Sequence, residues 1–363
     1  MIRSWRIVLV MLSLMAAMPV FSQSTDDLPA APSAVKQPKP APPQPARQPA
    51  PDAEQPKPAD SAPSATDLSD PRDKNDATAS ASDANTIRVP VNEVNVVFTV
   101  TDRHNHYVKD LSKADFKVID DDQPVEEIRS FRRETDLPLQ VGLLIDASNS
   151  IRERFKFEQE SAIEFLNDTI RPRYDQAFVV GFDVAPELTQ DFTDNSEKLS
   201  QGIRALQPGN ATAMYDALYY SCRDKLLKSP QANSVRRAII LVSDGDDNAS
   251  HVTREEAIEM ALRANTIVYT ISTNFPAGGD SDRYDKVLER IADATGGRAF
   301  RPFQLTDVAN AFAQIQDDLR SQYELSYHPA NFAHDGRYRT IAINAAKKGL
   351  KVRSRTGYYA PGE

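Results

Sequence analysis

Over its central half the chain alternates short apolar runs with longer stretches of helical periodicity. Apolar runs with few polar interruptions are typical of strands buried on both faces of a sheet. The runs of this kind are Leu139–Ile145, Phe178–Phe182, Ala238–Val242, Thr266–Ile271 and a shorter one at Gly297–Phe300. The stretches with helical periodicity are Glu153–Ile170, Glu197–Leu206, Ala213–Lys228, Arg254–Arg263, Tyr284–Ala294 and Asp307–Leu319. The alternation predicts an α/β domain over residues 137–320, with a doubly wound, mostly parallel sheet between two helical layers.

The segments on either side of this domain have a different pattern, because apolar and polar residues alternate as in half-buried strands. The apolar residues that share a face are Val94, Val96, Phe98 and Val100 before the domain, and Tyr323, Leu325 and Tyr327 after it. Alone, residues 85–136 or 321–363 would expose an apolar face and unpaired strand edges to water. We therefore expect the two segments to pack together as one small all-β, sandwich-like domain. In the alternative, the C-terminal strands pack against the α/β domain itself.

The N-terminus has the pattern of a secretory signal peptide. Arg3 and Arg6 precede an apolar run from Ile7 to Met18, and a small residue is available for cleavage near Ser22. Residues 1–22 are therefore predicted to be a signal peptide, and the protein to be exported to the periplasm or the extracellular space. The alternative, an uncleaved anchor, is disfavoured because the run is shorter than the roughly 20 residues that span a bilayer. No transmembrane segment is expected in the mature chain.

Residues 23–84 form a proline-rich region that is poor in large apolar residues. Thirteen of the 25 prolines in the chain lie between Pro29 and Pro71. A segment of this composition cannot bury enough apolar surface to offset its ordering entropy, so we expect a disordered linker. Proline favours extended conformations, which suits a spacer. A proline-rich docking motif and a stalk across the cell wall are the alternatives.

Charge and cysteine content exclude some partners and some chemistry. The formal net charge of −9 becomes −11 when Arg3 and Arg6 leave with the signal peptide, and this disfavours nucleic acid as a partner. Cys222 is the single cysteine, so an internal disulfide is impossible. We expect Cys222 to be a buried apolar residue within a helix, with a reactive thiol as the alternative.

Five oxygen-bearing side chains stand where a strand is predicted to end or a helix to begin. These are Asp146, Ser148, Ser150, Thr212 and Asp244. In open α/β sheets, ligands bind beyond the carboxyl ends of the strands, where two of these residues fall. Hard cations prefer a set of oxygen donors, whereas zinc and copper sites usually include nitrogen or sulfur. The five residues therefore predict a metal-binding cup for Mg²⁺, with Mn²⁺ or Ca²⁺ as substitutes.

These motifs resemble the metal-ion-dependent adhesion site of von Willebrand factor A domains, which have a Rossmann-like fold. Asp146, Ser148 and Ser150 match the first motif of that site, Thr212 the second and Asp244 the third. The resemblance implies that both serine hydroxyls bind the metal directly, and that the threonine binds it directly or through water. It also implies that the aspartates often act through water, and that one coordination position is open to a carboxylate of a protein partner.

The rest of the chain refines this resemblance. The second motif has Asn210-Ala211 where the family often has glycines, which can alter the loop. With its flanking strands, the chain is similar to the exported A-domain proteins typical of acidobacteria, a group without a settled activity. The resemblance thus implies an adhesion or interaction module that engages an acidic side chain of a protein partner.

Other motifs favour ordinary loops, and catalysis finds little support. Asp120–Asp122 is expected to form a hairpin turn, because Pro124 interrupts the pattern of a calcium loop. His104–His106 is expected to be a polar turn, with a nuclease or metal pair as the alternative. Asp246 and Asp247 are expected to be solvated loop carboxylates, with tuning of the metal as the alternative. The chain lacks the Gly-x-Ser-x-Gly elbow and the glycine-rich phosphate loops, so we expect no enzyme. The alternatives are a structural envelope protein stabilised by its metal and, less favoured, a hydrolase.

Overall fold

The computed structural model describes residues 93–133, 137–148, 155–229, 235–274, 281–330 and 333–362. All of them belong to one compact unit, Ser82–Glu363. The predicted signal peptide (1–22) and the predicted linker (23–84) lie outside the described residues. Among the helices that are described, none has the length and apolarity needed to cross a membrane.

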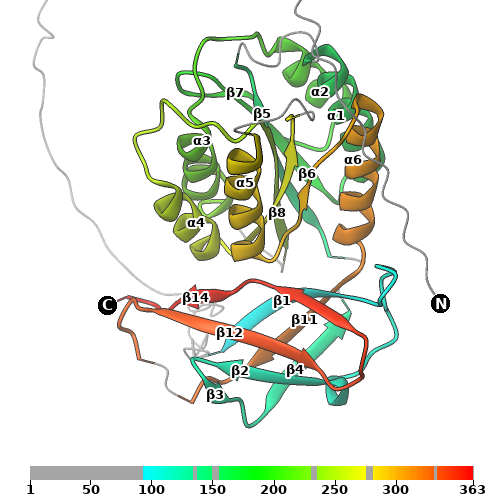
Figure 1. Cartoon of the computed structure of the whole chain (residues 1–363), viewed down its shortest axis with the longest axis vertical. Coiled ribbons are helices and arrows are strands. Elements are labelled where there is room, and N and C mark those ends of the chain that lie inside the picture. The colour runs from blue at the N-terminus through cyan, green and yellow to red at the C-terminus, as the bar shows by residue number, and fades with distance from the viewer. Residues whose placement is uncertain are drawn as a thin grey trace, which may run out of the picture. The chain divides into compact units, whose positions relative to one another are not determined.

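The central sheet lies between the helices in Figure 1. It has six strands in the order β10-β9-β8-β5-β6-β7. The strands are β5 (Leu139–Asp146), β6 (Gln176–Phe182), β7 (Pro186–Thr193), β8 (Arg236–Ser243), β9 (Thr266–Ser272) and β10 (Ala299–Phe300). Every neighbouring pair is parallel except β6 and β7. All residues of β5 and β8 are buried, as expected for strands covered on both faces. The predicted doubly wound, mostly parallel sheet is confirmed.

Strand β7 was not predicted, and its sequence explains why. Its residues are mostly polar and only half-buried, because β7 is the antiparallel edge of the sheet. An edge strand needs no continuous apolar run, so Pro186–Thr193 carries no strong strand pattern.

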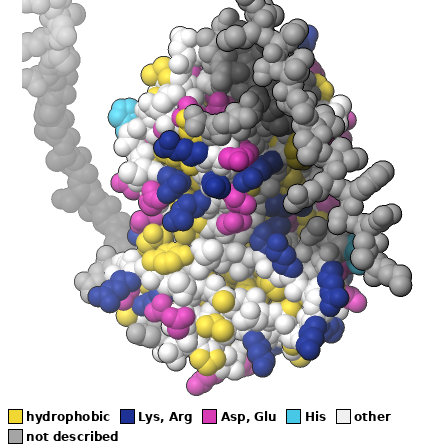
Figure 2. Space-filling view, viewed as in Figure 1, with side chains coloured by type: hydrophobic (Ala, Val, Ile, Leu, Met, Phe, Trp, Pro, Cys, Tyr) yellow, Lys and Arg dark blue, Asp and Glu magenta, His cyan; other side chains and the backbone are white. Residues whose placement is uncertain are grey.

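Helices cover both faces of the sheet (Figure 1). They are α1 (Phe155–Thr169), α2 (Ser196–Ala205), α3 (Met214–Tyr220) with the π-helical turn η3 (Ser221–Leu226), α4 (Arg254–Arg263), α5 (Ser281–Thr295) and α6 (Leu305–Leu319). Leu143 and Ile145 of β5 pack in one core with side chains of α1, α2 and α6. Leu144 points to the opposite core, with side chains of α3, α4 and α5. On the face shown in Figure 2, Lys and Arg side chains gather over α4 and α5.

The strands before and after the central sheet form two antiparallel sheets, with the orders β13-β1-β11-β4 and β14-β12-β2-β3. Their bounds are β1 (Val94–Thr101), η1 (Lys113–Asp115), β2 (Phe116–Asp120), β3 (Gln123–Pro124), β4 (Ile128–Arg133), β11 (Gln322–Tyr327), β12 (Tyr338–Ala345), β13 (Lys351–Ser354) and β14 (Gly357–Tyr359). Strand β11 lies between β1 and β4, with Leu325 opposite both Val96 and Phe131. The two sheets share one apolar core, so segments from both ends of the chain complete each other.

Two turns of this all-β region agree with the sequence. Asp121 and Asp122 have φ of 48° and 62° and connect β2 to β3, so the predicted hairpin turn is confirmed. Asp120, just before the turn, is buried and accepts hydrogen bonds from Tyr327 Oη (2.6 Å) and Tyr358 Oη (3.1 Å). The side chains of His104 and His106 are 80% and 79% exposed, in agreement with a polar turn.

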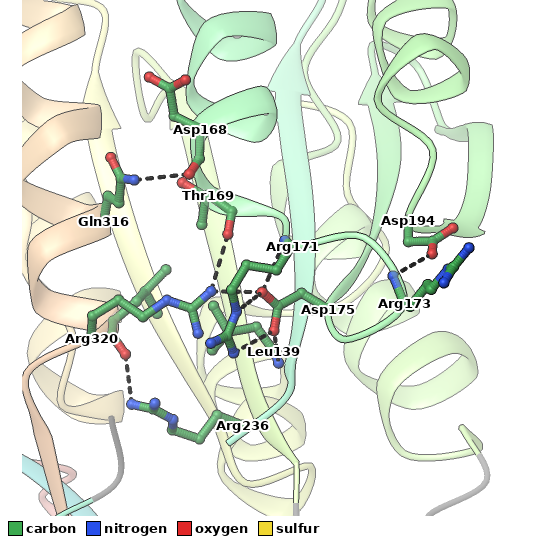
Figure 3. A network of polar contacts seen from close by, with 11 residues as sticks. Leu139, Asp168, Thr169, Arg171, Arg173, Asp175, Asp194, Arg236, Gln316 and Arg320 are labelled. Carbon is green, nitrogen blue, oxygen red and sulfur yellow. Dashed lines mark hydrogen bonds and ion pairs between the residues drawn. The ribbon is translucent and has the colours of Figure 1, made fainter. Parts of the chain in front are cut away.

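A buried carboxylate ties the central sheet to α1 and α6 (Figure 3). Asp175 accepts hydrogen bonds from Leu139 N (2.9 Å), Arg171 Nε (2.9 Å) and Arg320 (2.6 Å). Arg320 also donates to the Thr169 carbonyl (3.1 Å) at the end of α1. Burial raises the pKa of Asp175, but these hydrogen bonds outweigh it and hold the pKa below its usual value. The network fixes the amino end of β5 and the carboxyl ends of α1 and α6.

Cys222, in η3, is fully buried in the core on the α3–α5 side of the sheet. Burial raises the pKa of its thiol. The expectation of a core residue is therefore confirmed, and a reactive thiol is not favoured.

Candidate metal centre

Three of the loops at the carboxyl edge of the central sheet carry the predicted donors. Asp146 is the last residue of β5, with Ser148 two residues later, and Asp244 directly follows the end of β8. Strands β5 and β8 are parallel neighbours, so both aspartates emerge at the same edge. Thr212 precedes α3. Ser150 lies outside the described residues.

Hydrogen bonds of backbone groups, to other backbone groups and to one side chain, hold these loops together. Gly209 N donates to the Ala147 carbonyl, which joins the second motif to the first. Thr212 N donates to Asn248 Oδ1 (3.0 Å), and the Thr212 carbonyl accepts from Asn248 N (3.0 Å). The second motif is thus fastened to the loop that follows Asp244. The sequence did not indicate this role for Asn248, whose partner is far away in the chain.

Asp146 is oriented on both oxygens of its carboxylate. Oδ1 accepts a hydrogen bond from Ser148 N (2.8 Å), and Oδ2 accepts one from Ser243 Oγ (2.7 Å). Ser243 Oγ in turn accepts from Gly245 N (3.0 Å). Ser243 was missed from the sequence, because a serine at the end of a buried strand carries no pattern of its own. It is a positioning residue that links the first and third motifs.

The electrostatics of Asp146 are those of a carboxylate without a nearby balancing charge. Asp146 is fully buried, and Ser148 and Thr212 are 6% and 4% exposed. Burial raises the pKa of Asp146 to about 6; hydrogen bonds from Ser243 and Ser148 oppose the shift, and the negative charge of Asp244 adds to it. Burial and the charge of Asp244 both raise the pKa of Asp146. A divalent cation bound here would lower this pKa again, because its positive charge favours ionised carboxylates.

Asp244 is held against α5. Its carbonyl accepts a hydrogen bond from Asn274 Nδ2 (2.7 Å), and Asn274 also donates to Asp285 of α5 (3.0 Å). Gly245 has φ of +83°, and a Cβ there would lie 2.7 Å from the Tyr284 carbonyl, so the third motif requires glycine at this position. Asp244 Oδ1 accepts from Asp246 N (3.0 Å), which fixes one oxygen of the carboxylate.

The expectation for Asp247 was wrong. Asp247 is half-buried, and its Oδ2 accepts hydrogen bonds from Tyr215 N (2.9 Å) and Ser250 Oγ (2.6 Å). Its carboxylate thus satisfies a backbone N–H in the first turn of α3, where such groups have no partner within the helix. Asp247 fixes the start of α3 close to Thr212 and is not a freely solvated side chain.

The donors in the described loops are carboxylate and hydroxyl oxygens, which fit a hard cation such as Mg²⁺. Within the described part of the chain, no group of three or more His, Cys, Asp or Glu side chains is placed to hold a metal. The hydroxyls of Ser148 and Thr212 are therefore counted among the candidate ligands.

Comparison with known proteins identifies the central region. Residues 141–246 match the family model of the von Willebrand factor type A domain, and all five predicted metal ligands lie within this range. The chain therefore contains a von Willebrand factor type A domain match over the part of the central sheet that includes most of β5 and all of β6, β7 and β8. None of the curated proteins matches the chain.

Several solved structures are similar to this one. BatB from Bacteroides thetaiotaomicron has 17% identity and a TM-score of 0.41, covering 50% of this chain and 98% of BatB. The vWF domain of the type V pili tip protein Mfa5 from Porphyromonas gingivalis has 17% identity and a TM-score of 0.42, covering 51% and 95%. Proximal thread matrix protein 1 from the mussel byssus, with a zinc-occupied MIDAS motif, has 15% identity and a TM-score of 0.44. That match covers 54% of this chain and 50% of the mussel protein.

Proposed function

We propose that this chain is an exported protein-binding module in which a metal ion engages a carboxylate of a protein partner. The observation that carries the proposal is the pair of acidic side chains, Asp146 and Asp244, at neighbouring strand ends, with Asp146 fully buried. A buried carboxylate without a counter-charge is costly unless a cation is bound. Export to the periplasm or the extracellular space rests on the signal-peptide pattern of residues 1–22.

The proposed ligands are Asp146, Ser148, Ser150, Thr212 and Asp244, and Mg²⁺ is the proposed ion, with Mn²⁺ or Ca²⁺ as substitutes. When bound, the ion would supply a coordination position for a partner's acidic side chain. The chain's own contribution is to hold the donors in place. Ser243 and the Ser148 backbone orient Asp146, and Asn248 keeps Thr212 close to the third motif. The partner's acidic group is the complement of this site, and nucleic acid is not expected to bind.

Thermal unfolding with and without Mg²⁺ tests the metal site. At a free concentration 100-fold above Kd, a ligand that binds only the folded state stabilises it by about 2.7 kcal/mol. We expect the melting temperature of the wild type to rise with Mg²⁺, and that of Asp146→Ala and Asp244→Ala to stay constant. Asp246→Ala is the matched control, because it removes a carboxylate from the same loop but not from the donor set. An equal rise in all four proteins would refute the site.

Cross-linking and mass spectrometry on native envelope fractions, with and without EDTA, test partner binding. The proposal expects a cross-linked protein that is lost with EDTA and with Asp146→Ala. If Mg²⁺ raises the melting temperature but no cross-link depends on it, the metal only stabilises the fold, as in a structural envelope protein. Turnover of generic ester or phosphate substrates would instead favour a hydrolase.

A further inference from the structure

A groove of about 990 Å³ runs along α4 and α5 and reaches the β12 and β14 strands. Its volume is at the upper end of the range found for small-molecule sites. The side chains that matter for its chemistry are Arg283, Lys286, Arg290, Tyr215, Tyr338 and Tyr359. Figure 2 shows the Lys and Arg side chains over α4 and α5, with a cluster of hydrophobic side chains directly below them. The groove lies outside the donor set of the metal centre.

One wall is a row of cations on α5. Arg283, Lys286 and Arg290 are exposed and stand three and four residues apart, so they share one face of the helix. At a rise of 1.5 Å per residue, the row is roughly 10 Å long. Within the part of the chain that the structure describes, none of the three forms an ion pair.

Most acidic side chains of the groove are already neutralised. Glu255 pairs with Arg254, and Glu289 pairs with Arg301 at 3.0 Å. Among the described acidic residues that line the groove, Asp293 forms no ion pair. The wall therefore has an excess of positive charge, although the chain as a whole carries −9. An anionic ligand would be attracted to this groove and repelled by much of the remaining surface.

The lower end of the groove is aromatic. Tyr338 is 39% exposed and packs edge-on against Tyr359, with ring centroids 5.2 Å apart. Tyr338 Oη is hydrogen-bonded to Thr356 Oγ1 (2.9 Å), and the Arg263 guanidinium lies 4.8 Å from the centre of the Tyr359 ring. These contacts hold the rings in place, and rigid tyrosines offer apolar area at a low cost in conformational entropy.

We propose that this groove binds an extended acidic segment of a partner protein. Carboxylates of the segment would pair with Arg283, Lys286 and Arg290, and an aromatic or apolar side chain would pack on Tyr338 and Tyr359. Charge complementarity selects an acidic segment, and the tyrosines next to the cations favour a polypeptide over a purely anionic polymer. The proposal goes beyond the metal centre, because neither the cations nor the tyrosines are part of the proposed donor set.

The groove also lies beside the metal centre, so one partner can reach both. Tyr215, in its lining, donates its backbone N–H to Asp247, three residues after Asp244. Gly245 packs against Tyr284, the residue next to Arg283. A partner that places one carboxylate at the metal could continue along α5 with further acidic residues.

Fluorescence anisotropy on the full mature chain in EDTA tests the groove without the metal. The probes are a fluorescein-labelled poly-(Glu,Tyr) copolymer, poly-Glu and poly-Lys. We expect the copolymer to bind more tightly than poly-Glu, and this binding to weaken with salt. Poly-Lys is attracted by the net negative charge of the chain, and its binding should not weaken when the groove cations are reversed. Reversing the charge of two cations, Lys286→Glu with Arg290→Glu, should weaken copolymer binding about tenfold. Tyr338→Ala should remove the preference for the copolymer over poly-Glu.

Matched controls make the outcome decisive. Lys156→Glu with Lys198→Glu reverses two exposed cations on α1 and α2 and should leave binding unchanged. If this double substitution weakens copolymer binding as much as the double substitution on α5, the attraction is non-specific and the proposal is refuted. The EDTA buffer separates this test from that of the metal site, because no divalent cation is available to the donor set during the measurement. Equally tight binding of dextran sulfate would overturn the choice of a polypeptide. A synthetic peptide with the sequence of residues 65–84 is the last competitor. If it displaces the copolymer with the copolymer's own affinity, the groove binds a segment of this chain, and the proposal of a partner protein is overturned.

Discussion

The buried carboxylate of Asp146 leads to a prediction about stability that differs in sign from the usual effect of replacing a buried residue, which is destabilising. Burial raises the pKa of Asp146 from 3.8 to about 6 in the folded state. Near pH 7.5 and without metal, the folded protein must therefore hold an ionised group that the fold disfavours. The difference between the folded and unfolded pKa values of Asp146 corresponds to a loss of folding free energy of about 3 kcal/mol when the group is ionised. Asp146→Asn has nearly the same shape and no charge.

We expect Asp146→Asn to stabilise the metal-free protein at pH 7.5 by about 1–3 kcal/mol. The lower end allows for the hydrogen bond to Ser243, which must reverse its direction when an amide replaces a carboxylate oxygen. The same substitution should abolish stabilisation by Mg²⁺. In the wild type, the unfolded chain releases this proton near pH 4 and the folded protein only near pH 6. The group's destabilising effect therefore grows as pH rises from about 4 to about 6 and is absent below this window.

Urea unfolding followed by far-ultraviolet circular dichroism measures this free energy at pH 4.5 and 7.5, in EDTA and in Mg²⁺. Tryptophan fluorescence is unsuitable, because Trp5, the single tryptophan, leaves with the predicted signal peptide. The matched control is Asp191→Asn. There, Lys225 holds the pKa of the carboxyl below its usual value, so removing the charge should be neutral or slightly destabilising. If Asp146→Asn is less stable than the wild type in EDTA at pH 7.5, the assignment of an uncompensated charge is wrong.

Three further predictions concern the domains and the core. Limited proteolysis with a broad protease should remove residues 23–84 and leave a core that begins near Asn85; protection of the proline-rich region would contradict a disordered linker. A fragment of residues 137–320 should fold and bind Mg²⁺ if the A domain is inserted into a separate all-β domain. Insolubility of this fragment would show that the A domain depends on the flanking β-strands for its stability. Asp175→Asn should lower the free energy of unfolding by about 3 kcal/mol, since Arg320 loses its buried partner; urea unfolding measures this, and a change below 1 kcal/mol would refute it.

Local pattern was sufficient for the secondary structure around the central sheet, apart from the edge strand β7. The predicted helix Arg254–Arg263 has the same bounds as α4, and the apolar run Ala238–Val242 lies within β8. Burial on one face of a helix, or on both faces of a strand, leaves a period in the sequence that can be read without knowledge of the partners. The edge strand β7 lacks such a period, because none of its residues is fully buried and residues of intermediate exposure lie on both of its faces.

The amino-acid pattern predicts the order of strands and helices around the central sheet except for β7, the oxygen-donor chemistry of the five proposed ligands, and their meeting at one edge of the sheet. Only the tertiary structure decided that β11 lies between β1 and β4, and that Ser243 and Asn248 position Asp146 and Thr212. It also decided that the cations of α5 lie in the same groove as the tyrosines of β12 and β14. Periodicity records which face of an element is buried, whereas a contact between residues far apart in the chain depends on how the elements pack, and no local pattern specifies that.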